Sequence, residues 1–121
     1  MAWTHVDSES LYNVSNWGRG YFGINAAGNV QATPEGPDRP DKPGIDLYEL
    51  IGQIKRRGIA TPVLLRFDGI LRGRVRELNA AFNAARAEFN YQGPYRGVFP
   101  IKVNQQRHVV ESLLEEGRKH G

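Results

Sequence analysis

The chain has no cysteine among its 121 residues. Disulfide bonds and thiolate chemistry are therefore excluded within it. A chain without cysteine fits a reducing compartment, and we expect a cytoplasmic location.

Long hydrophobic runs are also missing. No stretch approaches the roughly 20 apolar residues that a transmembrane helix needs. The first ten residues include Trp3, His5 and Asp7, where a signal peptide would carry a basic start followed by an apolar run. We therefore expect no membrane partner and no secretory leader in this sequence.

Charge of a single sign is lacking as well. The 16 basic residues are interspersed with 13 acidic ones and leave a net charge of +3, so we expect no nucleic-acid partner. The three histidines, His5, His108 and His120, are too scattered in the sequence to indicate a metal site.

The composition that is present, 40% apolar and 24% charged, is typical of one soluble globular domain. Residues 13–33 alternate aromatic or branched residues with glycine, which predicts a β-hairpin with its turn near Gly28. Residues 33–44 contain four prolines and predict an exposed loop. Residues 45–58 predict a helix, with Asp46 as its N-cap and Gly58 at its end.

The second half of the sequence alternates strand and helix patterns. Short apolar runs at 61–67 and 96–103 predict buried strands, and periodic apolar residues predict helices at 70–89 and 108–116. Two buried strands joined by a long helix indicate a right-handed crossover with parallel strands, so the fold class is α/β. Two strands leave such a sheet incomplete, as at the start of a doubly wound sheet or an eightfold barrel.

Lys102 is the candidate catalytic residue, because it lies between Ile101 and Val103 in a predicted buried strand. A buried, unpaired ammonium group is costly, so burial would favour the neutral amine that forms Schiff bases. The alternative is that Lys102 lies at the end of the strand and extends its amine into solvent. The strand-to-helix turn that follows, residues 105–108, could face an anion or could be a solvated helix start.

Four runs of the sequence, in order, resemble the biosynthetic arginine decarboxylases, the large branch of the alanine-racemase-like pyridoxal-phosphate enzymes. They are YNVSNWGRGYF from Tyr12, IDLYELI from Ile45, TPVLLRFDGILRGRV from Thr61 and GVFPIKVNQQRHVVE from Gly97. A lone aromatic-Pro-Ile-Lys run would be a weak signal. Four runs in the family's order, covering nearly the whole chain, are a specific one.

The resemblance implies that Lys102 matches the lysine that forms a Schiff base with pyridoxal 5'-phosphate. It further implies decarboxylation of L-arginine to agmatine for polyamine synthesis, a homo-oligomeric enzyme and a possible Mg²⁺ requirement, although no magnesium ligands are evident. The chain would be the N-terminal portion of a (β/α)8 barrel. We expect residues 1–44 to form the hairpin region and the proline-rich loop, and residues 45–121 to begin the barrel.

Several parts of the family's site have no counterpart in the sequence. They are the glycine-rich phosphate loop, the acidic partner of the pyridine nitrogen, the substrate contacts and a cysteine that related enzymes supply across a dimer interface. We therefore expect the 121-residue chain alone to be inactive. Two alternatives stay open: a non-catalytic fragment that binds a partner, and a decarboxylase of the same fold acting on another amino acid such as diaminopimelate or carboxynorspermidine.

Overall fold

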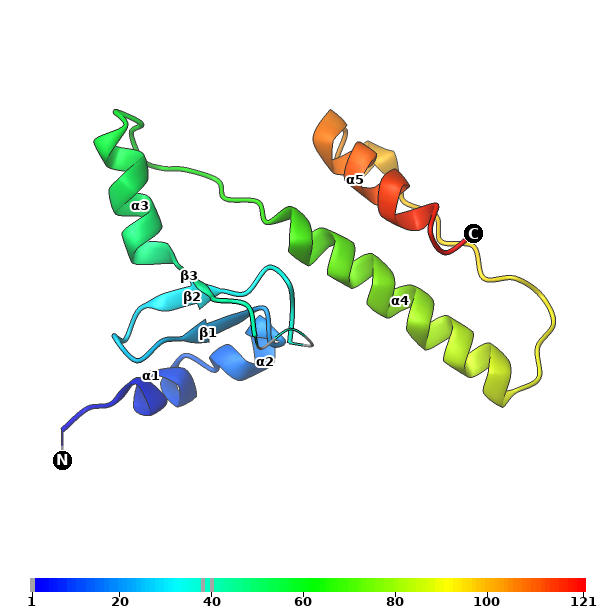
Figure 1. The fold of residues 1–121 in the computed structure, drawn as a ribbon, viewed down its shortest axis with the longest axis horizontal. Helices are drawn as coiled ribbons and strands as arrows, with labels where there is room; N and C mark the ends of the chain where they lie inside the picture. Colours follow the sequence, from blue (N-terminus) through cyan, green and yellow to red (C-terminus); the bar gives the residue numbers. More distant parts are fainter. Residues whose placement is uncertain (1, 38, 40) are drawn as a thin grey trace. The chain divides into compact units, whose positions relative to one another are not determined.

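The computed structural model describes residues 2–37, 39 and 41–121, which form two compact units, Met1–Phe67 and Asp68–Gly121 (Figure 1). Met1, Asp38 and Pro40 lie outside the described residues, so the predicted proline-rich loop is tested only at its other positions. The fold combines helices with a small antiparallel sheet, which agrees with the predicted α/β class at a coarse level.

Two short helices open the first unit. Helix α1 (His5–Leu11) begins at a capping box, in which the side chains of Thr4 and Asp7 each accept from the other residue's backbone N–H. Helix α2 (Val14–Gly18) occupies part of the region predicted as hairpin. Val14 is 1% exposed, so this helix contributes to the core of the unit.

The predicted hairpin forms further along the chain. Strands β1 (Phe22–Ile24) and β2 (Val30–Ala32) pair antiparallel, with Phe22 opposite Ala32. The turn between them contains Gly28, whose φ of +80° suits glycine, as predicted. A third strand, β3 (Ile45–Asp46), pairs with β2 and completes a sheet of order β1-β2-β3.

Helix α3 (Leu47–Arg56) follows β3 directly and confirms the helix predicted at 45–58. The Asp46 side chain caps it by accepting from the backbone N–H of Glu49 at 3.0 Å. Gly58, with a φ of +79°, follows the last turn, as the sequence predicted.

The predicted strand at residues 61–67 is not formed, because the segment has no regular secondary structure. Leu64, expected to be buried in a sheet, is 75% exposed. At the end of the segment, the Phe67 ring meets the Phe22 ring edge-on, with centroids 6.3 Å apart. The prediction was wrong for a physical reason: strands at an incomplete sheet have no neighbour to satisfy their backbone groups.

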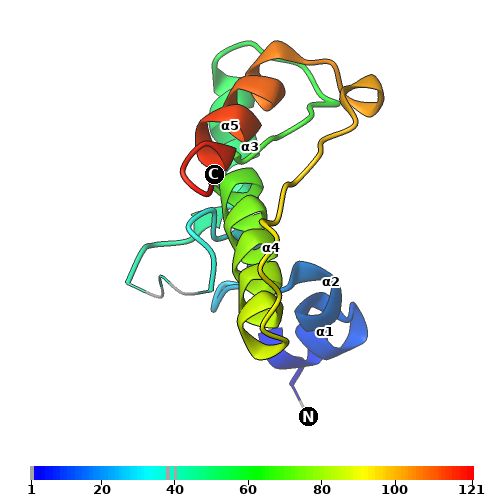
Figure 2. The same cartoon turned by 90° about the vertical axis from the view of Figure 1, so that its right-hand side faces the viewer.

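The second unit consists of two helices and the segment that joins them. Helix α4 (Asp68–Glu88) and helix α5 (Arg107–Gly117) confirm the helices predicted at 70–89 and 108–116. They run in the same direction, since Arg72 contacts Glu115 and, one turn later, Arg76 contacts Glu116 (Figures 1 and 2). Parallel neighbouring helices are the arrangement that a βαβ crossover produces.

Residues 89–106 therefore return along α4 to the start of α5, as Figure 2 shows. The predicted strand at 96–103 lies on this return segment but is wrong: residues 95–100 have no regular structure, and residues Ile101–Val103 form the 3-10 helix η1. Within the described residues no strand pairs with this segment, as at 61–67. The described chain thus follows the course of a βαβ crossover, but residues 61–67 and 96–103 do not form the backbone hydrogen bonds of a sheet.

Candidate functional site

Lys102 lies at the centre of η1, and its side chain is exposed. Within the part of the chain that the structure describes, its amine has no hydrogen-bond or ion-pair partner. This placement corrects the expectation of a lysine buried in a strand, which depended on a sheet that is not formed. Its neighbours Ile101 and Val103, expected in the same buried strand, are 53% and 69% exposed.

Short local hydrogen bonds hold the backbone around Lys102. The N–H of Val103 donates to the carbonyl of Pro100 at 3.0 Å, and the N–H of Asn104 donates to that of Ile101 at 3.1 Å. The Asn104 side-chain oxygen then accepts from the N–H of Gln106, the N-cap of α5, at 3.2 Å. Where no strand partner exists, the backbone groups satisfy one another within the turn.

The turn at residues 105–108 contributes one ion pair. The Arg107 guanidinium donates to the Glu111 carboxylate at 2.6 Å within α5, so this arginine is engaged in its own helix. Gln106 makes no side-chain cap bond. The anion site considered for this turn stays a prediction.

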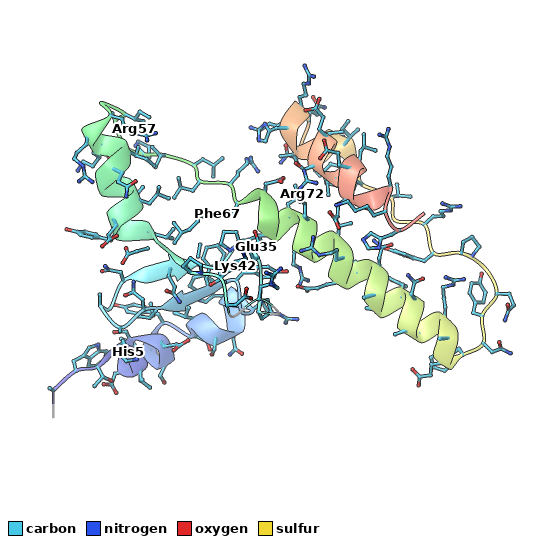
Figure 3. All side chains as sticks on the ribbon, in the orientation of Figure 1. His5, Glu35, Lys42, Arg57, Phe67 and Arg72 are labelled. Carbon is cyan, nitrogen blue, oxygen red and sulfur yellow. The ribbon has the colours of Figure 1, made fainter. Side chains whose placement is uncertain are left out.

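A chain of polar contacts joins the start of α4 to α5. The Arg72 guanidinium donates through Nε to Asp68 at 2.5 Å and through Nη2 to Glu115 at 2.7 Å. We call Asp68, Arg72 and Glu115 the α4–α5 strap (Figure 3, where Arg72 is labelled near the start of α4). A hydrogen bond from Ser112, followed in importance by the one from Arg72, lowers the pKa of the Asp68 carboxyl, and His108 lowers it further.

A second cluster surrounds Glu116, which is 2% exposed. Its carboxylate accepts from Lys119 at 2.8 Å and from Arg76 at 3.4 Å, and His120 lies at 3.6 Å. The hydrogen bond from Lys119 is the main cause of the lowered pKa of this carboxyl, and Arg76 adds to it. The buried charge is thus compensated from α4, through Arg76, and from the residues that follow the end of α5.

An apolar groove of about 750 Å³ lies between α4, α5 and the return segment. Val75 and Leu113 line it from the two helices, and Val98 and Ile101 line it from the return segment. Val98 is 89% exposed, so this side chain is not buried against the helices. Ile101, the neighbour of Lys102 in the sequence, is part of the groove wall.

The strap and the Glu116 cluster were not anticipated from the sequence. Asp68 and Arg72 are four residues apart, which is a signal for an intrahelical pair, but the predicted helix began only at residue 70. The partners on α5 could not be identified, because they depend on how the two helices pack. Among residues 2–37, 39 and 41–121, no three acidic or histidine side chains are grouped as metal ligands, and no helix is long and apolar enough to cross a membrane.

No family model matches the chain. Curated proteins do match it along nearly its whole length: it is 52% identical over 119 residues to the biosynthetic arginine decarboxylase of Thermosynechococcus vestitus, covering 98% of this chain and 18% of that protein. The corresponding enzymes of a Nostoc species and of Pseudomonas aeruginosa are 50% and 47% identical, over 98% and 93% of this chain and 17% of each enzyme. The chain thus spans less than a fifth of the length of these relatives.

Proposed function

Since this chain belongs by its sequence to the biosynthetic arginine decarboxylase family, we propose that it carries the lysine of a pyridoxal-phosphate site that decarboxylates L-arginine to agmatine. The observation that carries the proposal is the 52% identity to an arginine decarboxylase over 98% of the chain. The relatives that match over this span are named arginine decarboxylases. These names favour arginine as the substrate over the other amino acids considered, and they favour a catalytic over a purely binding role. The product would serve polyamine biosynthesis.

The surroundings of Lys102 support the proposed role as the cofactor lysine. Its amine is exposed and has no partner among the described residues, as a lysine must be to bind an aldehyde covalently. When bound, pyridoxal phosphate would supply the electron-withdrawing ring that accepts the electron pair of the broken bond. In the overall reaction the bond between Cα and the carboxylate breaks, carbon dioxide leaves, and a proton takes its place on Cα.

The residues of this chain act in the proposal by holding Lys102. The local bonds of η1 and the cap of α5 at Asn104 and Gln106 restrict the backbone from which the amine projects. A restricted backbone lowers the entropy lost when the amine meets its partner. We assign no phosphate holder, pyridine partner or magnesium ligand to the described residues.

The proposal extends to the architecture and assembly of the enzyme. Parallel helices α4 and α5, joined by a segment that returns along them, are compatible with the first units of a (β/α)8 barrel. We further propose a cytoplasmic homo-oligomer, as the resemblance implies.

Covalent trapping tests the role of Lys102. The complete gene product is incubated with pyridoxal phosphate, reduced with borohydride and digested, and the modified peptides are identified by mass spectrometry. We expect modification concentrated on Lys102 and lost in Lys102→Ala, whereas Lys55→Ala, an exposed lysine on α3, serves as the control and keeps it. Equal modification of both lysines in the wild type would contradict the proposal.

The substrate is tested in the same preparation. Carbon dioxide and the decarboxylated product of each substrate, agmatine in the case of arginine, are measured with L-arginine, diaminopimelate and carboxynorspermidine at equal concentration. We expect release from L-arginine alone, abolished by Lys102→Ala and unchanged by Lys55→Ala. Release from another amino acid, with none from L-arginine, would reassign the substrate.

A further inference from the structure

We propose that Arg72 is a positioning residue for Lys102, acting through the α4–α5 strap; this inference rests on the proposed function. Arg72 lies on α4 and has no contact with the Lys102 turn in the described structure. Its importance follows from the helix that it holds, because α5 begins five residues after Lys102. Fixing α5 therefore fixes one end of the segment that bears the amine.

Arg72 is the branching point of the strap. Its Nε is bound to Asp68 in its own helix, and its Nη2 reaches Glu115 across the helix pair. The Arg72 side chain is 25% exposed, whereas those of Asp68 and Glu115 are 54% and 60% exposed, so the arginine is the most enclosed member. A planar guanidinium can bind two carboxylates in fixed directions, which a lysine ammonium does less well.

The strap also determines the rotation of α5 about its axis. Asp68 is hydrogen-bonded to Ser112, and Glu115 lies almost one turn further along the same helix. Arg76 holds Glu116 at the next position. Contacts at three points along α5 leave it little freedom to rotate or slide on α4.

From α5 the restraint passes to Lys102 through the backbone. The Asn104 side chain binds the Gln106 N–H at the helix start, and the Asn104 N–H binds the Ile101 carbonyl in η1. With α5 free to move, this short connection would move with it. Val98 and Ile101, which line the apolar groove from the return segment, are 89% and 53% exposed, so these residues add little restraint close to Lys102.

Hydrogen exchange in the 121-residue chain tests this restraint without cofactor. In Arg72→Ala we expect roughly two- to fivefold faster exchange of the Val103, Asn104 and Val109 amides, the range for losing a partly exposed ion pair. Arg74→Ala is the matched control, because Arg74 pairs with Glu77 on α4 itself and not with α5. Unchanged exchange at Val103 and Asn104 in Arg72→Ala would overturn the inference.

A double-mutant cycle shows whether the effect passes through Glu115. Glu115→Gln should raise exchange at the same amides, and the double variant with Arg72→Ala should add little further, because the two residues act as a pair. Arg72→Lys, which keeps the positive charge but not the planar guanidinium that binds two carboxylates, should give an intermediate rate of amide exchange. Full additivity of the two single variants would overturn the proposed route.

Cofactor capture in the complete gene product distinguishes the two proposals. We expect Arg72→Ala to weaken binding of pyridoxal phosphate a few-fold, with Phe82→Ala, a variant at the far end of α4, as the control for lost stability. If Arg72→Ala matches Phe82→Ala while Lys102→Ala abolishes capture, the positioning role fails and the proposed function stands. If Lys102→Ala itself keeps full capture, the proposed function fails.

Discussion

Asn29 donates a side-chain hydrogen bond to Asp46 at 2.9 Å, which joins the turn of the hairpin to the residue that caps helix α3. Asn25, at the start of the same turn, donates to the same carboxylate oxygen at 2.7 Å. The other oxygen of Asp46 accepts from the Glu49 N–H. One carboxylate therefore connects the sheet and the helix of the first unit.

Asp46→Ala should destabilise the first unit, because it removes a helix cap and two side-chain bonds to the hairpin at once. We expect the melting temperature to fall by roughly 5 °C or more, followed by circular dichroism. Asp46→Asn, which can still cap, should lose less. Asp41→Ala, which breaks only an exposed pair with Arg39, is the control and should melt close to the wild type.

Gly20→Ala should destabilise the same unit through a steric conflict. Gly20 has a φ of +78°, and a Cβ at this position would lie 2.7 Å from Cβ of Pro37. We expect a loss of at least about 1–2 kcal/mol in the free energy of unfolding, measured by urea denaturation. Gly28→Ala, at a φ of +80° with open space around the Cβ, separates backbone strain from the clash; an equal loss there would contradict a role for Pro37.

Acid should weaken the second unit. The pKa of Glu116 is lowered, chiefly by Lys119, and that of Asp68 is lowered, chiefly by Ser112. Each carboxylate binds protons less readily in the folded than in the unfolded chain. Its contribution to the free energy of unfolding is therefore complete above the ordinary pKa of the carboxyl, which is 4.5 for Glu116, and is lost as the pH falls through the lower pKa of the folded chain. We expect the free energy of unfolding to be level from pH 5 to 7 and to decrease below about 4.5.

Glu116→Gln provides the control for this pH dependence. The variant keeps the shape of the side chain but cannot titrate, so its unfolding free energy should decrease less between pH 5 and pH 3. The Glu35→Gln variant removes a carboxyl in the first unit, which lies outside the Glu116 cluster, and should keep the wild-type slope. A Glu116→Gln profile identical to the wild type would show that this carboxylate does not carry the acid sensitivity.

The far end of α4 is held by an aromatic pair. The rings of Phe82 and Tyr95 are stacked, with centroids 4.2 Å apart and planes 6° from parallel. Such pairs contribute about 0.5–1.5 kcal/mol beyond area burial, so Phe82→Ala and Tyr95→Ala should each destabilise the unit, with a coupling of that size in a double-mutant cycle followed by urea unfolding. Phe82→Leu should retain part of the stability, and a coupling near zero would contradict the pair's contribution.

The 121-residue chain alone should not decarboxylate arginine. It offers the amine of Lys102 but no residues that we assign to the phosphate, the pyridine nitrogen or the substrate. We expect no agmatine above the level produced by free pyridoxal phosphate, measured by chromatography after prolonged incubation with L-arginine. Agmatine production that depends on Lys102 would contradict this expectation.

The helices could be predicted from the sequence because their signals are local. Asp46 and Gly58 mark the ends of α3, and the apolar period from Leu71 to Phe89 marks α4; each depends on residues within a few turns. The hairpin turn at Gly28 was equally local. Helix α2 was missed, since the aromatic and glycine residues around Trp17 were read as a strand pattern.

The strands and the surroundings of Lys102 could not be predicted in the same way. A strand needs a partner, and whether residues 96–103 have one depends on chain segments far away in the sequence. The burial of Lys102 was inferred from its apolar neighbours and failed together with the strand. The strap partner Glu115 lies 43 residues from Arg72, a relationship that periodicity cannot reveal.

The parallel course of α4 and α5 also has a kinetic consequence. Each helix can form within about a microsecond, but contacts between residues some 40 positions apart must wait until the return segment closes the intervening loop. Pairing of α4 with α5 should therefore carry the entropic cost of closing this loop, which the formation of either helix alone does not. Substitutions that stiffen residues 90–100, or insertions that lengthen this segment, would change the folding rate while leaving the helices themselves intact.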